Sequence, residues 1–244
     1  MKSHMKHIIA TVLFALSAGI ATAASPAGQT TEDKIRAAIA PVLAGEEIEK
    51  IGPSPYAGLY EVLTARGMLY TDKTGGFVIF GATLIDTKTK ADLTTRRVDE
   101  IVRFSFASLP LGDAVKTVRG DGSRVLATFE DPNCGFCKKL YSELQKINNV
   151  TVYTFLTPIL SPDSTTKAKA IWCSPDRSAA WGETMSGRAN QATVAECPTP
   201  LERNLALYRK LHLNGTPTTF LSNNKKIAGY VNADRILTLL AERP

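Results

Sequence analysis

The sequence predicts two folded parts, a small α+β module followed by an α/β domain, and three observations support this division. Short apolar runs between residues 59 and 80 indicate strands, whereas residues 87–110 are charged and modestly helical. An apolar run at 124–129 leads directly into a helical pattern. A chain of 244 residues is also long for one domain and comfortable for two.

Residues 1–23 have the pattern of a secretory signal peptide. Lys2 and Lys6 give a basic start, residues 8–21 an apolar core, and Ala21-Thr22-Ala23 a small-residue cleavage site. This core is shorter than the roughly 20 apolar residues that a membrane-spanning helix needs. We therefore expect cleavage rather than a membrane anchor, and export to an oxidising compartment where disulfides persist.

The charge balance argues against nucleic acid as a partner. Loss of Lys2 and Lys6 with the signal would lower the formal net charge from +6 to +4, and no block of Lys and Arg is longer than two residues. Two of the three histidines also lie in the signal, which leaves His212 alone. We therefore expect neither a histidine-based metal site nor a catalytic triad.

Residues 24–86 predict a β-rich module without cysteine. Thr31 or Asp33 can cap the N-terminus of a short helix, and Gly45 ends it. Its apolar face comprises Ile35, Ile39 and Val42. Strand-like segments follow at 59–63, 68–70 and 77–80. A core drawn from about 60 residues is marginal alone, which favours pairing with a second subunit.

The remaining chain predicts a connecting helix and a larger domain. Residues 87–110 place Leu93, Val98, Ile101 and Val102 on one side and end at Leu109-Pro110. Residues 111–244 follow the order β-α-β, a helical insertion at about 158–213, and then β-β-α. The strands of this domain are expected at 124–129, 150–156, 218–221 and 226–231.

The most informative motif is Cys134-Gly135-Phe136-Cys137, which opens the helix after the strand at 124–129. A Cys-x-x-Cys pair at a strand-to-helix junction is the thioredoxin-type redox arrangement, and the element order is that of thioredoxin with a helical insert. Cys134 would lie at the helix N-terminus, where unpaired N–H groups and the helix dipole favour a thiolate. The thiolate is the nucleophile in disulfide exchange. We expect Phe136 to lie on the surface and to contact the substrate.

Four cysteines allow three disulfide pairings. Cys134 and Cys137 suit a labile pair, whereas Cys173 and Cys197 flank the insertion and suit a structural one, which would contribute on the order of 3 kcal/mol. One alternative is a four-cysteine zinc site, but that usually needs a second Cys-x-x-Cys knuckle. The other alternative is a purely structural Cys134/Cys137 pair.

Two further features flank the motif. Asn214-Gly215-Thr216-Pro217 precedes a strand, and in thioredoxin-like folds a proline at this place is cis and faces the redox pair. The backbone of Thr216 could then pair with an extended substrate, although an ordinary turn proline is the simpler interpretation. Glu130 and Asp131 either assist proton transfer to Cys137 or have a capping or solvent-facing role.

With these motifs the chain resembles the DsbC/DsbG family of periplasmic disulfide isomerases over essentially its whole mature length. The most specific stretches are Asp131-Pro132-Asn133-Cys134-Gly135-Phe136-Cys137-Lys138-Lys139-Leu140, Ala170-Ile171-Trp172-Cys173 and Gly215-Thr216-Pro217. The resemblance implies a homodimer held by N-terminal cystatin-like modules, each joined by a linker helix to a thioredoxin-fold domain. Gly81 matches a glycine in the family's dimer-forming strand.

The resemblance also implies individual roles. Cys134 would be the exposed nucleophile, Cys137 the resolving thiol, Cys173–Cys197 the structural disulfide and Pro217 the cis-proline. The chain departs from the family in having Gly-Phe where the DsbC branch usually has Gly-Tyr and the DsbG branch Pro-Tyr, and glycine favours the DsbC branch. Position 128, a buried acid in thioredoxin itself, is Thr128.

The expected function is isomerisation of wrong disulfides in misfolded exported proteins, through a mixed disulfide at Cys134. It would need an electron donor, by resemblance an inner-membrane DsbD-type reductase, and neither metal nor organic cofactor. One alternative is a DsbG-like reductase that protects single cysteines from over-oxidation. The other is a holdase chaperone with secondary redox activity.

Overall fold

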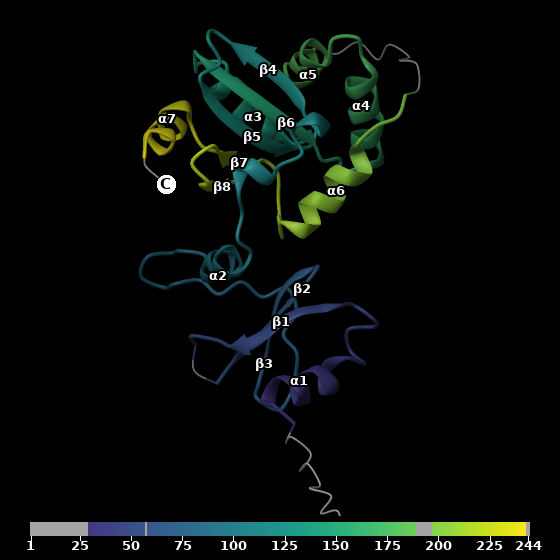
Figure 1. Ribbon diagram of the computed structural model, residues 1–244, viewed down its shortest axis with the longest axis vertical. Helices are drawn as coiled ribbons and strands as arrows, with labels where there is room; N and C mark the ends of the chain where they lie inside the picture. Colours follow the sequence, from purple (N-terminus) through teal and green to yellow (C-terminus); the bar gives the residue numbers. More distant parts are fainter. Residues whose placement is uncertain (1–28, 57, 189–196, 243–244) are drawn as a thin grey trace, which may run out of the picture.

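The computed structural model describes residues 29–56, 58–188 and 197–242, so the expected signal peptide at 1–23 lies outside the described residues. An N-terminal module, a short helix and a larger α/β domain follow one another along the long axis of the molecule (Figure 1). Within these ranges no helix is both long enough and apolar enough to cross a membrane.

The N-terminal module consists of one helix on a three-stranded antiparallel sheet. The elements are α1 (Thr31–Ile39), β1 (Ile48–Pro53), β2 (Tyr60–Thr64) and β3 (Gly67–Thr71), with strand order β1-β2-β3. Ile35 and Ile39 of α1 are buried against Ile51, Val62 and Leu69 of the sheet. The strand β1 was not predicted, because the adjacent Glu49 and Lys50 interrupt its apolar pattern and Gly-Pro ends it.

Two details of α1 differ from the prediction. Thr30 caps the helix, since its hydroxyl accepts from the Asp33 N–H while the Asp33 carboxylate accepts from the Thr30 N–H. Helical geometry ends at Ile39, so Val42 is 57% exposed and Leu43 takes the buried position. Gly45, in the left-handed region at φ +86°, ends the turn that follows.

The predicted strand at 77–80 is wrong. Only Tyr70 and Ile79 pair, through two backbone hydrogen bonds of 3.3 and 2.8 Å, so the segment makes an isolated bridge to β3. The side chains of Phe77, Ile79 and Phe80 are 44%, 39% and 53% exposed. Gly81 follows in the left-handed region at φ +63°. A strand needs pairing along its length, and the described residues of this chain do not provide it.

The connecting helix α2 (Leu93–Ile101) is shorter than the predicted 87–110. Asp92 caps its N-terminus, and Asp86 instead holds the preceding residues in a turn by accepting from the Lys88 and Thr89 N–H groups. Val98 packs on Leu63, Met68 and Tyr70 of the N-terminal module. Short 3-10 turns at Phe106–Ser108 and Leu111–Asp113 lead into the next domain.

The larger domain is built on a five-stranded sheet with order β4-β6-β5-β7-β8. Its elements are β4 (Val115–Arg119), β5 (Arg124–Glu130), α3 (Gly135–Leu144), β6 (Val150–Leu156), α4 (Pro162–Cys173), α5 (Arg177–Met185), α6 (Leu201–Lys210), β7 (Thr218–Leu221), β8 (Lys226–Ala228) and α7 (Ala233–Ala241). β5 and β6 are parallel, and the other neighbours are antiparallel. The short edge strand β4 was not predicted, because charged residues interrupt its apolar pattern.

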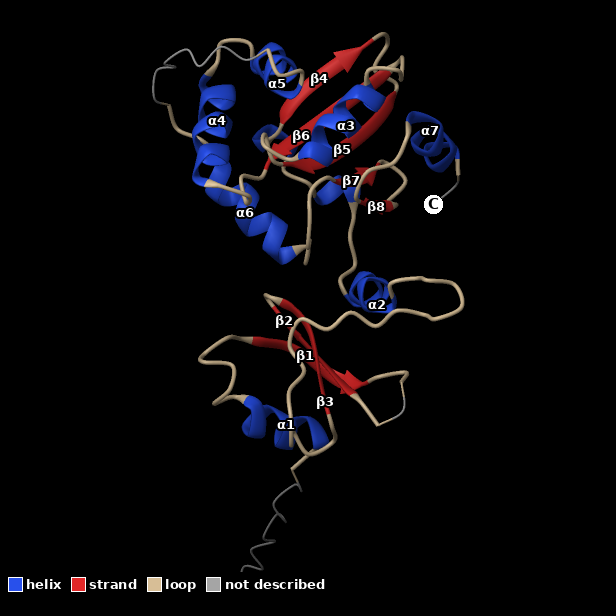
Figure 2. Ribbon diagram, turned by 180° about the vertical axis from the view of Figure 1, so that it is seen from behind, coloured by secondary structure: helices blue, strands red, loops and turns tan. Residues whose placement is uncertain are grey.

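Helices cover both faces of this sheet (Figure 2). On one face, Leu126 of β5 packs with Leu140 and Leu144 of α3 and with Ile236 of α7. On the other face, Phe129 stacks on Phe155 with ring centroids 4.8 Å apart, and Tyr208 of α6 joins them. Because side chains alternate along a strand, Leu126, Thr128 and Glu130 all face α3.

Candidate redox site

The motif lies where β5 passes into α3, and Cys134 is the N-cap of that helix. Its Sγ accepts the backbone N–H of Cys137 at 3.3 Å and lies 3.3 Å from the carbonyl oxygen of Thr216. Both Cys134 and Cys137 are free thiols. Cys134 was expected to be exposed but is only 5% exposed, because the turn that carries Thr216 lies against it.

The two thiols have unequal surroundings. Cys137 is fully buried among apolar side chains. Burial raises the pKa of the Cys137 thiol, and the nearby carboxylate of Glu130 raises it further, since both disfavour a second negative charge. Cys137 is therefore a neutral thiol at physiological pH, while Cys134 has an N–H donor directed at its sulfur.

The structure brings Thr216 and Pro217 to the same place. The Thr216–Pro217 peptide bond is cis, Pro217 is buried and Thr216 is half-buried. β7 pairs with β5 so that Thr218 lies opposite Phe129, which puts the preceding Thr216-Pro217 beside the end of β5. Gly81, the predicted interface residue, belongs to the N-terminal module and is not part of this site.

Exposed apolar side chains lie within the motif and in a loop tied to Asp131, three residues before it. Phe136 is 57% exposed, with the Lys139 ammonium 5.1 Å from its ring centroid, and a Cβ at Gly135 would meet no atom within 4 Å. Ile159 and Leu160, in the loop after β6, are 41% and 56% exposed. This pair was not predicted, although two large apolar residues between Pro158 and the helix cap Ser161 are a recognisable signal in the sequence.

Asp131 fixes the loop that carries Ile159 and Leu160. Asp131 is fully buried, so the solvent-facing alternative for it is wrong. One carboxylate oxygen accepts the N–H groups of Ile159 and Leu160 at 2.8 and 2.9 Å. The other accepts from the Asn133 N–H at 2.7 Å and the Ser164 hydroxyl at 2.8 Å. Its role is therefore to cap and join the two loops.

Asn133, directly before the nucleophile, is anchored to α4. Its side-chain Nδ2 donates to Asp163 at 2.8 Å, and its Oδ1 accepts from the Lys167 ammonium at 2.7 Å. Lys167 and Asp163 also form a 2.7 Å ion pair one turn apart on the helix. The helical insertion thus holds the turn before Cys134 in position, a role that sequence reasoning did not assign.

Glu130 ends β5 on the α3 face and is 1% exposed. The hydroxyl of Thr128 donates to its Oε1 at 2.6 Å, while its Oε2 has no hydrogen-bond partner among the described residues. Burial raises the pKa of the Glu130 carboxyl to about 7, and the Thr128 hydrogen bond opposes that rise. A carboxyl that titrates near neutrality therefore lies close to the redox pair.

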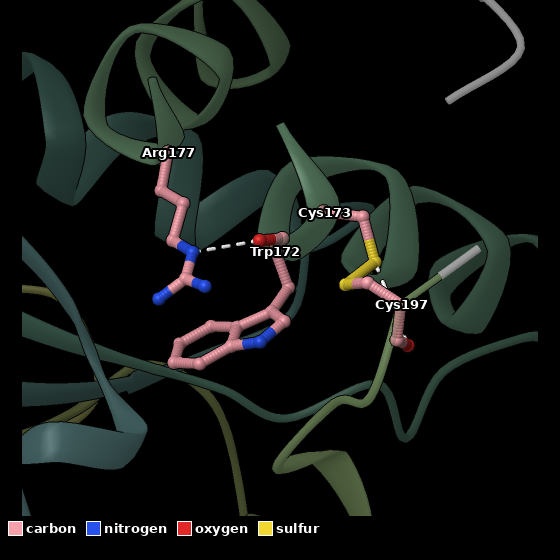
Figure 3. Close-up of a disulfide and its surroundings, with 4 residues drawn as sticks. All are labelled: Trp172, Cys173, Arg177 and Cys197. Atoms are coloured by element: carbon pink, nitrogen blue, oxygen red, sulfur yellow. Dashed lines mark hydrogen bonds between the residues drawn. A yellow bond between two sulfur atoms is a disulfide. The ribbon is translucent and has the colours of Figure 1, made fainter. Parts of the chain in front are cut away.

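The second cysteine pair closes the insertion. Cys173, at the end of α4, forms a disulfide with Cys197, which lies shortly before α6 (Figure 3). The neighbouring Trp172 is buried, and the Arg177 guanidinium lies 3.8 Å from its ring centroid while donating to the Trp172 carbonyl. In the described residues, no three His, Cys, Asp or Glu side chains gather as a metal site would require.

Comparison with known families and structures agrees with this geometry. Residues 111–243 match the model of a thioredoxin-like domain, and residues 22–95 match that of the disulfide bond isomerase protein N-terminal domain. A crystal structure of a disulfide interchange protein from Neisseria gonorrhoeae is 37% identical with a TM-score of 0.52, and covers 54% of this chain and 96% of its own. The predicted thioredoxin fold is therefore confirmed.

Curated relatives span both parts of the chain. The probable thiol:disulfide interchange protein DsbC of Bordetella parapertussis is 43% identical over 204 residues, which cover 84% of this chain and 72% of that protein. Thiol:disulfide interchange protein DsbC of Escherichia coli is 29% identical over 190 residues, 76% of this chain and 78% of that protein.

Proposed function

This chain belongs to the DsbC family of thiol:disulfide interchange proteins, and from that premise we propose that it rearranges incorrect disulfides of exported proteins in the periplasm. It is a thiol–disulfide oxidoreductase with a thioredoxin-like domain. The observation that carries the proposal is the inequality of the two free thiols. Cys134 sits at a helix N-terminus with a donor on its sulfur, and Cys137 is buried behind it.

The reaction begins with the Cys134 thiolate. It attacks one sulfur of a wrong disulfide, so that a Cys134–substrate bond forms and the other substrate sulfur leaves as a thiolate. That thiolate, or another in the substrate, then attacks the mixed disulfide and leaves a rearranged bridge. Alternatively Cys137 attacks Cys134, which releases reduced substrate and leaves the enzyme oxidised.

Substrate binding follows from the groups around Cys134. The backbone of Thr216 pairs with an extended substrate strand beside Pro217, and Gly135 lets that strand approach closely. The exposed side chains of Phe136, Ile159 and Leu160 offer apolar contact to unfolded segments. Such contacts are sequence-tolerant, which suits an enzyme whose substrates share misplaced disulfides rather than a motif.

The cellular arrangement completes the proposal. A signal peptide at 1–23 exports the chain, and two copies associate through their N-terminal modules near Gly81. Only a reduced Cys134–Cys137 pair starts the cycle, so an electron donor is required, and a DsbD-type inner-membrane reductase is the proposed one.

Refolding of a scrambled multi-disulfide protein tests the proposal. The intact protein should restore native disulfides, Cys134→Ala should restore none, and Cys137→Ala should accumulate mixed disulfides with the substrate. Activity that survives in Cys134→Ala would instead support a holdase chaperone. Release of reduced substrate without any rearrangement would support a DsbG-like reductase.

A further inference from the structure

A row of buried polar side chains runs across the sheet beneath α3. Thr128 on β5 lies opposite Thr154 on β6 and Thr219 on β7, and each of the three is 1% exposed or less. The hydroxyl of Thr219 and the Oε2 atom of Glu130 have no hydrogen-bond partner among the described residues. An unpaired buried polar atom usually costs about 1–3 kcal/mol, so its retention calls for an explanation.

The strand register places Glu130 on the face of the sheet that carries the redox pair. Glu130 lies beside Leu156 in the parallel pairing of β5 and β6, so the two side chains share a face of the sheet. Leu156 packs in the same buried cluster as Cys134 and Cys137. The unpaired carboxylate oxygen therefore belongs to the part of the core that holds the sulfur atoms.

We propose that Glu130 is the proton acceptor for Cys137 when that thiol resolves the mixed disulfide. This inference deepens the proposed function and rests on it. As the Cys137 sulfur bonds to Cys134 Sγ, the bond from Cys134 to the substrate sulfur breaks and the substrate leaves with the electron pair as a thiolate. The proton of Cys137 passes to the Glu130 carboxylate. When the disulfide is later reduced, the same carboxyl returns the proton to Cys137.

The surroundings suit this role. Glu130 shares this face of the sheet with Thr128, Thr154 and Thr219. Burial raises the pKa of the Cys137 thiol, and the charge of Glu130 raises it further. Within the described part of the chain Glu130 forms no ion pair, and Thr128 donates the one hydrogen bond to its carboxylate. Asp131, the next residue, turns its carboxylate to the loop after β6 instead. A pKa of about 7 also lets the carboxyl accept and release a proton near neutral pH.

A reaction with Ellman's reagent separates the two thiols. Attack by Cys134 on the reagent in reduced full-length protein releases one thionitrobenzoate, and attack by Cys137 on the resulting mixed disulfide releases a second. In Glu130→Gln the second phase should slow by about 100-fold at pH 8, within the usual contribution of a general base, and lose its inflection near pH 7. The first phase should change by less than about threefold.

Three variants serve as controls. Glu202→Gln removes an exposed carboxylate of the same domain and should leave both phases unchanged. Glu130→Asp should keep the inflection. Thr128→Val removes the hydrogen bond that lowers the carboxyl pKa, so it should move the inflection of the second phase to higher pH.

The outcomes are separable. A second phase in Glu130→Gln with the rate and inflection of the unmodified protein overturns the role of Glu130 but leaves the proposed function standing. If Glu130→Gln does not fold, Thr128→Val decides, and an inflection that stays in place overturns the inference. Absence of the first phase in the unmodified protein would contradict the proposed function itself.

Discussion

The sheets of the two parts of the molecule are covered to different extents. In the thioredoxin-like domain α3 and α7 cover one face, and α6 packs on the aromatic cluster of the other. In the N-terminal module the apolar segment at 77–80 makes one bridge to β3 and leaves three large side chains exposed. The apolar faces of the larger sheet are therefore covered by helices of the same chain, whereas the N-terminal module leaves an apolar segment exposed, as the proposed dimer interface requires.

The exchange reaction and the proposed dimer contact therefore belong to different parts of the molecule. Every residue assigned to the exchange reaction lies in the larger domain. The N-terminal module contacts that domain through a hydrogen bond from His212 Nε2 to Glu49 at 3.0 Å. The connecting segment packs on the larger domain more closely, with Phe104 packed against Phe220 at a ring-centroid distance of 4.0 Å. A change in one part should therefore leave the folding of the other intact, and the predictions below test that independence.

The largest effect is expected at the exposed segment. Phe80→Glu should convert a dimer to a folded monomer that still reduces disulfides but loses most isomerase activity, because two redox sites facing one substrate raise the effective concentration. Phe80 is preferred to Gly81, where φ +63° would strain any side chain. Sedimentation and refolding of a scrambled protein measure the two properties.

Val118→Glu is the matched control, because Val118 is 51% exposed on the edge strand of the larger domain. It should remain dimeric and active. A Phe80→Glu protein that stays dimeric, or a monomer that isomerises as well as the parent, would contradict the assignment of assembly to this segment.

The next effect concerns the covalent closure of the insertion. Replacing both Cys173 and Cys197 by Ala should lower the free energy of unfolding by about 3 kcal/mol, because the disulfide closes a loop across a sequence separation of 24. Exchange at Cys134 should continue. Denaturant unfolding measures the first effect and insulin reduction the second. Reduction of both cysteine pairs at the same potential would contradict the assignment of a structural role to Cys173–Cys197 and a redox role to Cys134–Cys137.

A smaller effect is expected from the buried carboxyl of Glu130, which should destabilise the larger domain when it is ionised. Folding raises the pKa of the Glu130 carboxyl from an ordinary 4.5 to about 7, so the folded state disfavours its ionisation. The protein is therefore more stable while Glu130 is protonated, and this contribution to the free energy of unfolding is lost as pH rises from about 4.5 to about 7. Glu130→Gln should therefore stabilise the protein by roughly 2–3 kcal/mol at pH 8 and by little at pH 4. Thermal unfolding at both pH values measures this difference. Equal changes in unfolding temperature at pH 4 and pH 8 would contradict the raised pKa of the Glu130 carboxyl.

The smallest effect is expected at Lys167. Lys167→Met removes the hydrogen bond to Asn133 and the half-exposed ion pair with Asp163, so the free energy of unfolding should fall by less than about 1 kcal/mol. Hydrogen exchange at the amides of residues 133–135 should nevertheless become faster. Lys169→Met, an exposed position of the same helix, should change neither. Unchanged exchange in Lys167→Met would show that α4 does not hold the redox turn.

Sequence reasoning succeeded where periodicity and motif coincide. The apolar run of β5 followed by the Cys-x-x-Cys and by Leu140 and Leu144 predicted a strand, a helix N-terminus and a buried helix face, and all three are present. The segment at 77–80 has the composition of a strand, but a strand depends on its partner. Composition carries no information about whether a pairing strand is available.

The sequence predicted the positions of the two redox cysteines, but it did not predict where the carboxylates of Glu130 and Asp131 lie. Whether Glu130 faces a helix or solvent depends on strand register, and a single residue's shift would reverse it. The near-complete burial of Cys134 depends on Thr216, which is 82 residues away in the chain. Such long-range contacts leave no local pattern in the sequence.

The helix α4 meets the redox turn at one end and the disulfide at the other. Asp163 and Lys167 contact Asn133, and Cys173 closes the far end of this 12-residue helix. Each residue of an α-helix advances it by 1.5 Å and rotates it by about 100°. Inserting or deleting one residue between Lys167 and Cys173 would leave the length of α4 almost unchanged. With Lys167 kept in contact with Asn133, however, Cys173 would be rotated away from Cys197. The insertion is therefore constrained in its rotational phase, and only changes of whole helical turns should preserve both contacts.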